Sequence, residues 1–197
     1  MPILNDGAMS KTNHTFSLPN LLTYARILAI PFIIILALSG NDALRWVALI
    51  LFAIAAITDF FDGYLARKWN LVSPIGRMLD PIADKLLVGA LLIAFAYDKT
   101  FSAFDLIPAI IILMREILVS GMREYLGNEK VALPVTMLAK YKTTVQLVAL
   151  GILFAEPVMG GLALISNIFL WLAAILTMIT GWDYWRVTIK YMSGAKK

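Results

Sequence analysis

Six long apolar segments, joined by short polar turns, make up most of this chain. They cover roughly residues 21–38, 44–65, 73–97, 104–126, 134–154 and 162–182. An α-helix needs about 20 apolar residues to cross the hydrocarbon core of a bilayer. Backbone groups in lipid must be hydrogen-bonded within their own segment, which favours helices. We therefore predict an all-α polytopic membrane protein with six transmembrane helices and a polar cavity that faces the cytoplasm.

The composition agrees with a membrane location and excludes several chemistries. Hydrophobic residues make up 60% of the 197 residues and charged residues 15%, whereas soluble domains are about 45–50% apolar and about 25% charged. The chain has no cysteine, which excludes disulfides, zinc–thiolate sites and cysteine nucleophiles. The single histidine, His14, is expected in an exposed polar tail. No cleavable signal peptide is expected, since the first apolar run is too long for one.

The distribution of Lys and Arg predicts how the chain is oriented. The loops expected on one side contain only Arg45 and Lys99, whereas all other Lys and Arg lie on or just inside the opposite side. The positive-inside rule places the richer side, and with it both termini, in the cytoplasm. The net charge of +4 is interpreted in the same way, as a charge that sets the orientation in the membrane and attracts anionic lipid. No basic run interleaved with aromatic residues is present, so nucleic acid is not an expected partner.

Four aspartates stand at the facing ends of the second and third segments. Asp59 and Asp62 are three residues apart, and Asp80 and Asp84 are four apart, so each pair shares one helix face. The short connection makes the two helices antiparallel neighbours, which can bring all four carboxylates together. Acidic side chains in apolar helices are costly and indicate function. Oxygen ligands of this number suit Mg²⁺ or Mn²⁺, with two ions sharing a carboxylate.

Small residues and one arginine accompany the aspartates. Gly63, Ala66 and Gly76 are expected to leave space for a flat base or a pyrophosphate, and Arg67 supplies a cation for phosphate oxygens. The alternative is that the aspartates are helix-end charges that face water. That alternative explains two aspartates well, but not four at this spacing with these companions.

At every defined position, the motif resembles the signature of the CDP-alcohol phosphotransferases; its residues are Asp59, Asp62, Gly63, Ala66, Arg67, Gly76, Asp80 and Asp84. The resemblance implies a six-helix membrane enzyme, commonly a homodimer, that transfers a phosphatidyl group from a CDP-linked lipid to an alcohol and releases CMP. It implies that the first three aspartates bind metal and that Asp84 both borders the metals and acts as general base. Nucleotide and pyrophosphate contacts would fall to Asp62, Gly63, Ala66, Arg67 and Gly76.

The start of the first segment also resembles this family. Residues 18–26 match the element that helps to wall the nucleotide pocket, and Asn20, Thr23 and Arg26 lie on nearly one helix face. We assign these three residues to CDP-lipid binding. The alternative is a helix cap followed by an interfacial arginine.

Four further cations bear on the identity of the acceptor alcohol: Arg115, Arg123, Lys140 and Lys142. Together they can form a pocket for an acceptor that carries its own phosphate. Positive-inside bias and headgroup contact are the alternative, which explains Arg123 and Lys142 easily but Arg115, next to Glu116 in mid-segment, poorly. These stretches resemble those of family members that use sn-glycerol 3-phosphate. That resemblance implies CDP-diacylglycerol as donor, with phosphatidylglycerol phosphate and CMP as products.

Two other functions stay open at this point. A sibling enzyme using inositol phosphate, serine or phosphatidylglycerol would share the aspartates, but a phosphate-free acceptor would leave the basic cluster unused. An aspartate-lined divalent-cation transporter would need a path to both faces, and the expected outer loops offer only Asp42, Asp98, Asp105 and Glu156.

We divide the chain into a polar N-terminal segment (residues 1–19), a six-helix transmembrane catalytic domain (residues 20–190) and a basic C-terminal tail (residues 191–197). The expected location is a bacterial inner membrane, with the active site facing the cytoplasm. Membrane lipids and a second copy of the chain are the expected macromolecular partners.

Overall fold

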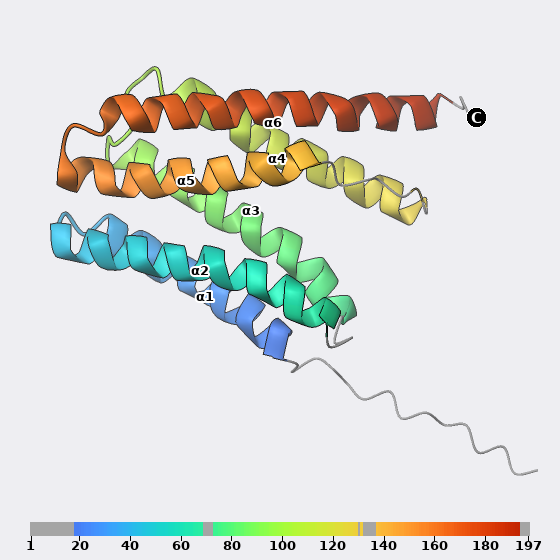
Figure 1. Ribbon diagram of the computed structural model, residues 1–197, viewed down its shortest axis with the longest axis horizontal. Helices are drawn as coiled ribbons and strands as arrows, with labels where there is room; N and C mark the ends of the chain where they lie inside the picture. The colour runs from blue at the N-terminus through green and yellow to red at the C-terminus, as the bar shows by residue number, and fades with distance from the viewer. Residues whose placement is uncertain (1–17, 69–72, 130, 132–136, 194–197) are drawn as a thin grey trace, which may run out of the picture.

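The structure is a computed structural model that describes residues 18–68, 73–129, 131 and 137–193, without the side chains of residues 18–19, 60–68 and 77. Over these residues the only regular secondary structure is helical, which confirms the predicted all-α class. The helices are α1 (Leu18–Ala37), α2 (Asp42–Lys68), α3 (Pro74–Tyr97), α4 (Leu106–Asn128), α5 (Met137–Met159) and α6 (Ala163–Met192) (Figure 1).

Three of these helices are long and apolar enough to cross a membrane by length and composition. They are α1, α5 and α6, with candidate spans Asn20–Ala37, Met137–Met159 and Ala163–Met192 among the described residues. The other three helices carry the aspartates of the motif and the Arg115–Glu116 pair. Six helices are therefore present among the described residues and three of them are candidate spans, whereas the prediction that all six cross the membrane stays a prediction.

The helices pack as a closed ring. Each makes its main contacts with two neighbours, in the order α1, α2, α5, α6, α4, α3 and back to α1. In Figure 1, α1 and α2 lie side by side on one side of the molecule, and α5 and α6 on the other. The ring makes neighbours of helices that are distant in sequence, such as α2 with α5 and α4 with α6.

The interior of the ring is apolar at one end and polar at the other. The main core draws on all six helices, and the Phe154 ring lies 5.5 Å from that of Phe52 and 5.0 Å from that of Phe95. Helix direction alternates along the chain, so the start of α1 lies at the same end of the ring as the end of α6 (Figure 1). Buried polar residues collect at that end: Asn20, Thr23, Arg26, Lys142, Gln146, Thr177 and Thr180.

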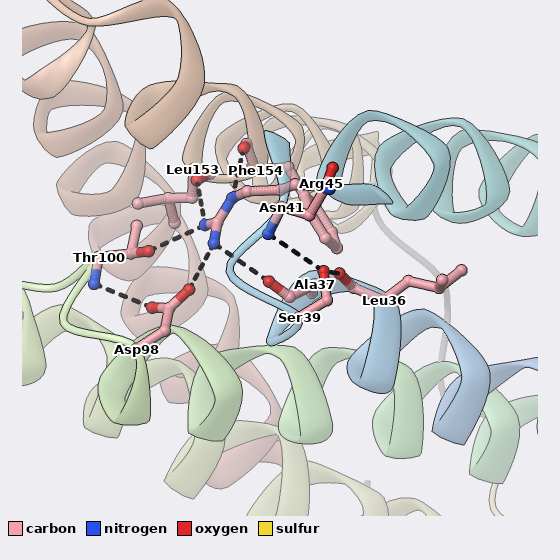
Figure 2. Close-up of polar contacts among 9 residues, drawn as sticks. All are labelled: Leu36, Ala37, Ser39, Asn41, Arg45, Asp98, Thr100, Leu153 and Phe154. Carbon is pink, nitrogen blue, oxygen red and sulfur yellow. Dashed lines mark hydrogen bonds and ion pairs between the residues drawn. The ribbon is translucent and has the colours of Figure 1, made fainter. Parts of the chain in front are cut away.

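A buried arginine ties the apolar end together (Figure 2). Arg45 was predicted as an outer-loop cation, which is wrong, because it lies buried in the first turns of α2. Its guanidinium donates five hydrogen bonds, to the carbonyls of Ala37 (3.4 Å), Leu153 (3.3 Å) and Phe154 (2.9 Å), to the Asp98 carboxylate (2.5 Å) and to the Thr100 hydroxyl (2.9 Å). These partners come from α1, α5 and the end of α3, so one side chain joins four helices.

Helix boundaries match the prediction at Ser73 and differ at Pro157. Ser73 caps α3, with Pro74 in its first turn, as predicted. The fifth helix was predicted to end near residue 154, but α5 continues through Pro157 to Met159. Proline lacks the N–H that would bind the carbonyl four residues earlier. That carbonyl belongs to Leu153, and Arg45 donates to it instead, so the helix can continue.

The last helix was predicted to end near Trp182 but continues to Met192. At 1.5 Å per residue its 30 residues are about 45 Å long, well beyond the ~30 Å hydrocarbon core. The residues that follow Trp182 therefore belong to this helix as far as Met192, two residues into the segment predicted as a basic tail.

Candidate active site

The polar face of α1 forms one wall of the candidate site. Asn20, Thr23 and Arg26, spaced three residues apart, are all buried. The Thr23 hydroxyl donates to the Asp80 carboxylate over 2.7 Å. Arg26 pairs with Asp59 and lies 3.4 Å from the Asp84 carboxylate. A buried arginine that binds two aspartates is not an interfacial arginine, so that alternative is wrong for Arg26.

Asn20 fits closely against the start of α3. The Ser73 hydroxyl donates to Asn20 Oδ1 over 2.8 Å and accepts from the Gly76 N–H over 2.9 Å. A Cβ added to Gly76 would lie 2.6 Å from Asn20 Oδ1, closer than real Cβ contacts allow. Gly76 was predicted to leave space for a ligand. In the structure that space is taken by Asn20, so this glycine lets α1 approach α3.

The aspartates of the motif are partly exposed while their cationic partner is buried. The Asp59 side chain is 36% exposed and that of Asp84 50%, against 2% for Arg26. Arg26 and Thr23 thus hold three carboxylates, from two helices, against α1. Their outward oxygens stay accessible to a ligand.

The rest of the motif belongs to α2, but its side chains lie outside the described residues: Asp62, Gly63, Ala66 and Arg67. Among the side chains that are described, no group of three or more acidic or histidine residues is arranged to hold a metal ion. Because Asp62 is not among them, the four-aspartate metal site stays a prediction.

Arg115 is fixed by α6. Its Nε donates to the Thr177 carbonyl over 3.1 Å and one terminal nitrogen donates to the Thr180 hydroxyl over 2.9 Å. The guanidinium carbon lies 5.9 Å from the centre of the Tyr184 ring. A Cβ on Gly181 would lie 3.0 Å from Arg115 Cγ, so the small residue allows this packing.

A second cation joins Arg115 at Glu116. The Lys142 ammonium, on α5, pairs with Glu116 Oε1, and Arg115 approaches the same oxygen at 3.6 Å. Lys85, which follows Asp84 on α3, lies within electrostatic range of Glu116, Arg115 and Arg123, and donates to the Pro81 carbonyl over 2.6 Å. The structure therefore brings Arg115 and Lys142 together at Glu116, within electrostatic range of Lys85.

The other two predicted acceptor residues are placed differently. Arg123 is exposed on α4, two turns beyond Arg115, and lies within electrostatic range of it. Lys140 is exposed on α5, and residues two apart on a helix do not share a face, so it points away from the face of Lys142.

Sequence reasoning missed Lys85 and the α6 residues as site components. Lys85 directly follows Asp84, the last aspartate of the motif, and this position in the sequence indicates that it lies near the site. The sixth apolar segment carries three polar side chains at helical spacing, Thr177, Thr180 and Tyr184. This spacing indicates one polar helix face, which could have been predicted to line the site.

Comparison with known proteins agrees with the motif. A sequence profile of the CDP-alcohol phosphatidyltransferase family matches residues 16–179. Relatives named CDP-diacylglycerol–glycerol-3-phosphate 3-phosphatidyltransferase match nearly their whole length. The one from Rickettsia bellii is 50% identical over 182 residues (89% of this chain, 97% of the relative), and that from Rickettsia felis 48% over 178 residues (89% and 97%). The one from Cereibacter sphaeroides is 39% identical over 224 residues (92% and 99%).

Identity at this level over nearly the whole chain establishes the family and confirms the resemblance drawn from the aspartate motif. With three candidate membrane spans and bacterial relatives, the protein is an integral membrane protein. The chain belongs to the CDP-alcohol phosphatidyltransferase family.

Proposed function

We propose that the protein transfers the phosphatidyl group of CDP-diacylglycerol to sn-glycerol 3-phosphate and releases phosphatidylglycerol phosphate and CMP. The relatives carry the name of this activity. The observation that carries the proposal for this chain is the pair of Lys142, which is buried, and Arg115, whose side chain is 10% exposed, both of which approach Glu116 Oε1. An acceptor without a phosphate has no use for these two cations within a membrane protein.

The donor occupies the end of the ring between α1, α2 and α3. Asp59, Asp62, Asp80 and Asp84 would hold Mg²⁺ or Mn²⁺, as two ions, and the oxygen donor set with its accessible outward atoms fits such ions. When bound, the metal neutralises charge on the pyrophosphate. Thr23 and Arg26 orient the carboxylates. The nucleotide and pyrophosphate would be bound by Asn20, Thr23, Arg26, Asp62, Gly63, Ala66 and Arg67, whereas Gly76 lets α1 approach α3.

Asp84 is the proposed general base. It takes the proton of the primary hydroxyl of glycerol 3-phosphate as that oxygen attacks the phosphorus that carries diacylglycerol. The new P–O bond forms while the bond from that phosphorus to CMP breaks, and CMP leaves with the electron pair. The half-exposed Asp84 side chain is accessible to a small acceptor.

The acceptor phosphate binds at the cationic cluster. Arg115 and Lys142 contact it directly, with Arg123 contributing at the outer rim, whereas Lys140 points away from this face. A phosphate dianion takes charge-assisted hydrogen bonds from arginine and lysine. Because Lys85 adjoins Asp84, the hydroxyl of a short acceptor can reach the base while its phosphate stays on the cations.

The proposed setting is a bacterial inner membrane crossed by all six helices, with the catalytic domain at residues 20–190 between the polar segment 1–19 and the tail 191–197. The polar end of the ring then faces the cytoplasm as a cavity, because the Lys and Arg excess lies at that end. The protein acts as a homodimer surrounded by membrane lipid.

The test is CMP release by purified protein in detergent with Mg²⁺ and CDP-diacylglycerol. Glycerol 3-phosphate, inositol phosphate, serine and phosphatidylglycerol are offered separately. The proposal predicts release with glycerol 3-phosphate only. Release with another acceptor would overturn the acceptor assignment, and absence of release with all four would overturn the enzyme assignment in favour of the transporter, which vesicle uptake of Mn²⁺ would then check.

A further inference from the structure

Glu116 is surrounded by more positive than negative charge. Four cations from three helices gather around this position, each within electrostatic range of Arg115 or Lys85: Lys85, Arg115, Arg123 and Lys142. The carboxylates that face them among the described residues are Glu116 and Asp84. The cluster therefore keeps an excess of positive charge that a dianion can balance.

The innermost part of the cluster is largely removed from solvent. The side chains of Glu116, Lys142 and Arg115 are 13%, 5% and 10% exposed. Buried charges at membrane depth need counter-ions, and removing one partner of a buried pair leaves an uncompensated charge. Before an acceptor arrives, Glu116 serves this need, because its Oε1 contacts Lys142 and faces Arg115.

Glu116 does not itself hold Arg115 in place. Two nitrogens of that guanidinium are already bound to the Thr177 carbonyl and the Thr180 hydroxyl. The nitrogen that faces Glu116 lies 3.6 Å from its oxygen, beyond a normal hydrogen bond. The position between Arg115 of α4, which α6 holds in place, and Lys142 of α5 is filled by a carboxylate oxygen of Glu116.

We propose that Glu116 is an internal counter-ion that occupies the position of the acceptor's phosphate in the unloaded enzyme, and that the phosphate displaces it from Lys142 and Arg115. This inference rests on the proposed function. A phosphate carries close to two negative charges at neutral pH and a carboxylate one, so a phosphate-bearing acceptor outcompetes Glu116 and a neutral alcohol does not. The same competition helps the phosphate-bearing product to leave.

The test is Glu116→Gln, which keeps the size of the side chain and removes its charge. The KM for glycerol 3-phosphate should fall about five-fold, since one unit of competing charge is lost in a partly desolvated site, while the KM for CDP-diacylglycerol stays within about two-fold. Without acceptor, the variant should unfold at a lower temperature than the wild type. Inorganic phosphate should then raise its unfolding temperature more than that of the wild type.

Glu124→Gln is the matched control, because Glu124 is an exposed carboxylate two turns further along α4. It should leave both KM values and the response to phosphate unchanged. Should Glu116→Gln fail to fold, Glu116→Asp draws the carboxylate back by one methylene and should lower the KM for glycerol 3-phosphate by a smaller factor.

An unchanged or raised KM for glycerol 3-phosphate in the Glu116 variants, with no larger response to phosphate, would overturn the counter-ion role and make Glu116 a support for Lys142. Failure of the proposed function looks different. In that case the wild type itself releases no CMP with glycerol 3-phosphate, while the unfolding measurement with inorganic phosphate still reports on Glu116.

Discussion

Two arginines that are largely removed from solvent, Arg45 in the first turns of α2 and Arg115 in the middle of α4, are bound in different ways. Arg45 uses all five guanidinium N–H donors on protein acceptors, and one of these is the Asp98 carboxylate, which also accepts from the Thr100 N–H (Figure 2). Arg115 makes two hydrogen bonds to α6, and the carboxylate nearest to it is 3.6 Å away and already paired with Lys142.

The difference separates a structural charge from one available to a ligand. The Arg45 guanidinium has no N–H donor left for a substrate, because protein acceptors take all five, and its role is to join helices. A cluster with excess positive charge and half-exposed aspartates nearby is incomplete without an anion. The apolar end therefore carries stability, and the polar end carries the proposed chemistry.

The largest effect is expected at the polar end. Asp84→Asn should lower turnover by about 100- to 10,000-fold, the usual contribution of a general base, and leave the unfolding temperature in detergent near that of the wild type. CMP release and thermal unfolding are the two measurements. Turnover close to the wild-type level would remove Asp84 from the base role.

The converse effect is expected at the apolar end. Arg45→Met leaves the Asp98 carboxylate and the carbonyls of Leu153 and Phe154 without their donor, which should destabilise the fold by about 3–5 kcal/mol. Denaturant unfolding in detergent measures the loss. The protein that remains folded should keep both KM values, and a selective change in the KM for glycerol 3-phosphate would break the contrast between the two ends.

Arg115→Ala should separate the two substrates. A hydrogen bond to a charged group contributes about 1.5–3 kcal/mol, so the KM for glycerol 3-phosphate should rise about 10- to 100-fold. The KM for CDP-diacylglycerol should change far less. Equal increases for both substrates would mean that Arg115, like Arg45, mainly supports packing, in this case of α4 against α6.

The smallest expected effect is at Gly76. A methyl group there meets Asn20 Oδ1 at 2.6 Å, so Gly76→Ala should push α1 from α3 at a cost of about 1–3 kcal/mol. Because Asn20, Thr23 and Arg26 line the proposed donor pocket, the KM for CDP-diacylglycerol should rise more than that for glycerol 3-phosphate. Gly121→Ala is the matched control, since nothing lies within 4 Å of a Cβ at that position.

Local patterns in the sequence were sufficient to predict the helices and the motif. Apolar runs located all six helices, and Ser73 followed by proline marked the start of α3. The helical spacing of Asn20, Thr23 and Arg26 identified a face that does contact the motif aspartates. Each of these signals lies within a few residues, where spacing alone determines which side chains share a face.

Features that depend on distant residues were not predictable in this way. The fifth helix passes through Pro157 because Arg45, 109 residues from Phe154 in sequence, supplies donors to the carbonyls of Leu153 and Phe154. The space beside Gly76 is taken by Asn20 of another helix. The meeting of Lys142 with Glu116 likewise follows from the order of helices in the ring, which hydropathy does not encode.

The most direct test of the central claim is acceptor binding to an enzyme that cannot turn over. Asp84→Asn protein with Mg²⁺ and CDP-diacylglycerol is titrated with glycerol 3-phosphate or with glycerol, and its unfolding temperature is followed. The account predicts a rise with glycerol 3-phosphate, none with glycerol, and loss of the rise when Arg115→Ala is added. Equal responses to the two acceptors, or a rise that survives the loss of Arg115, would contradict it.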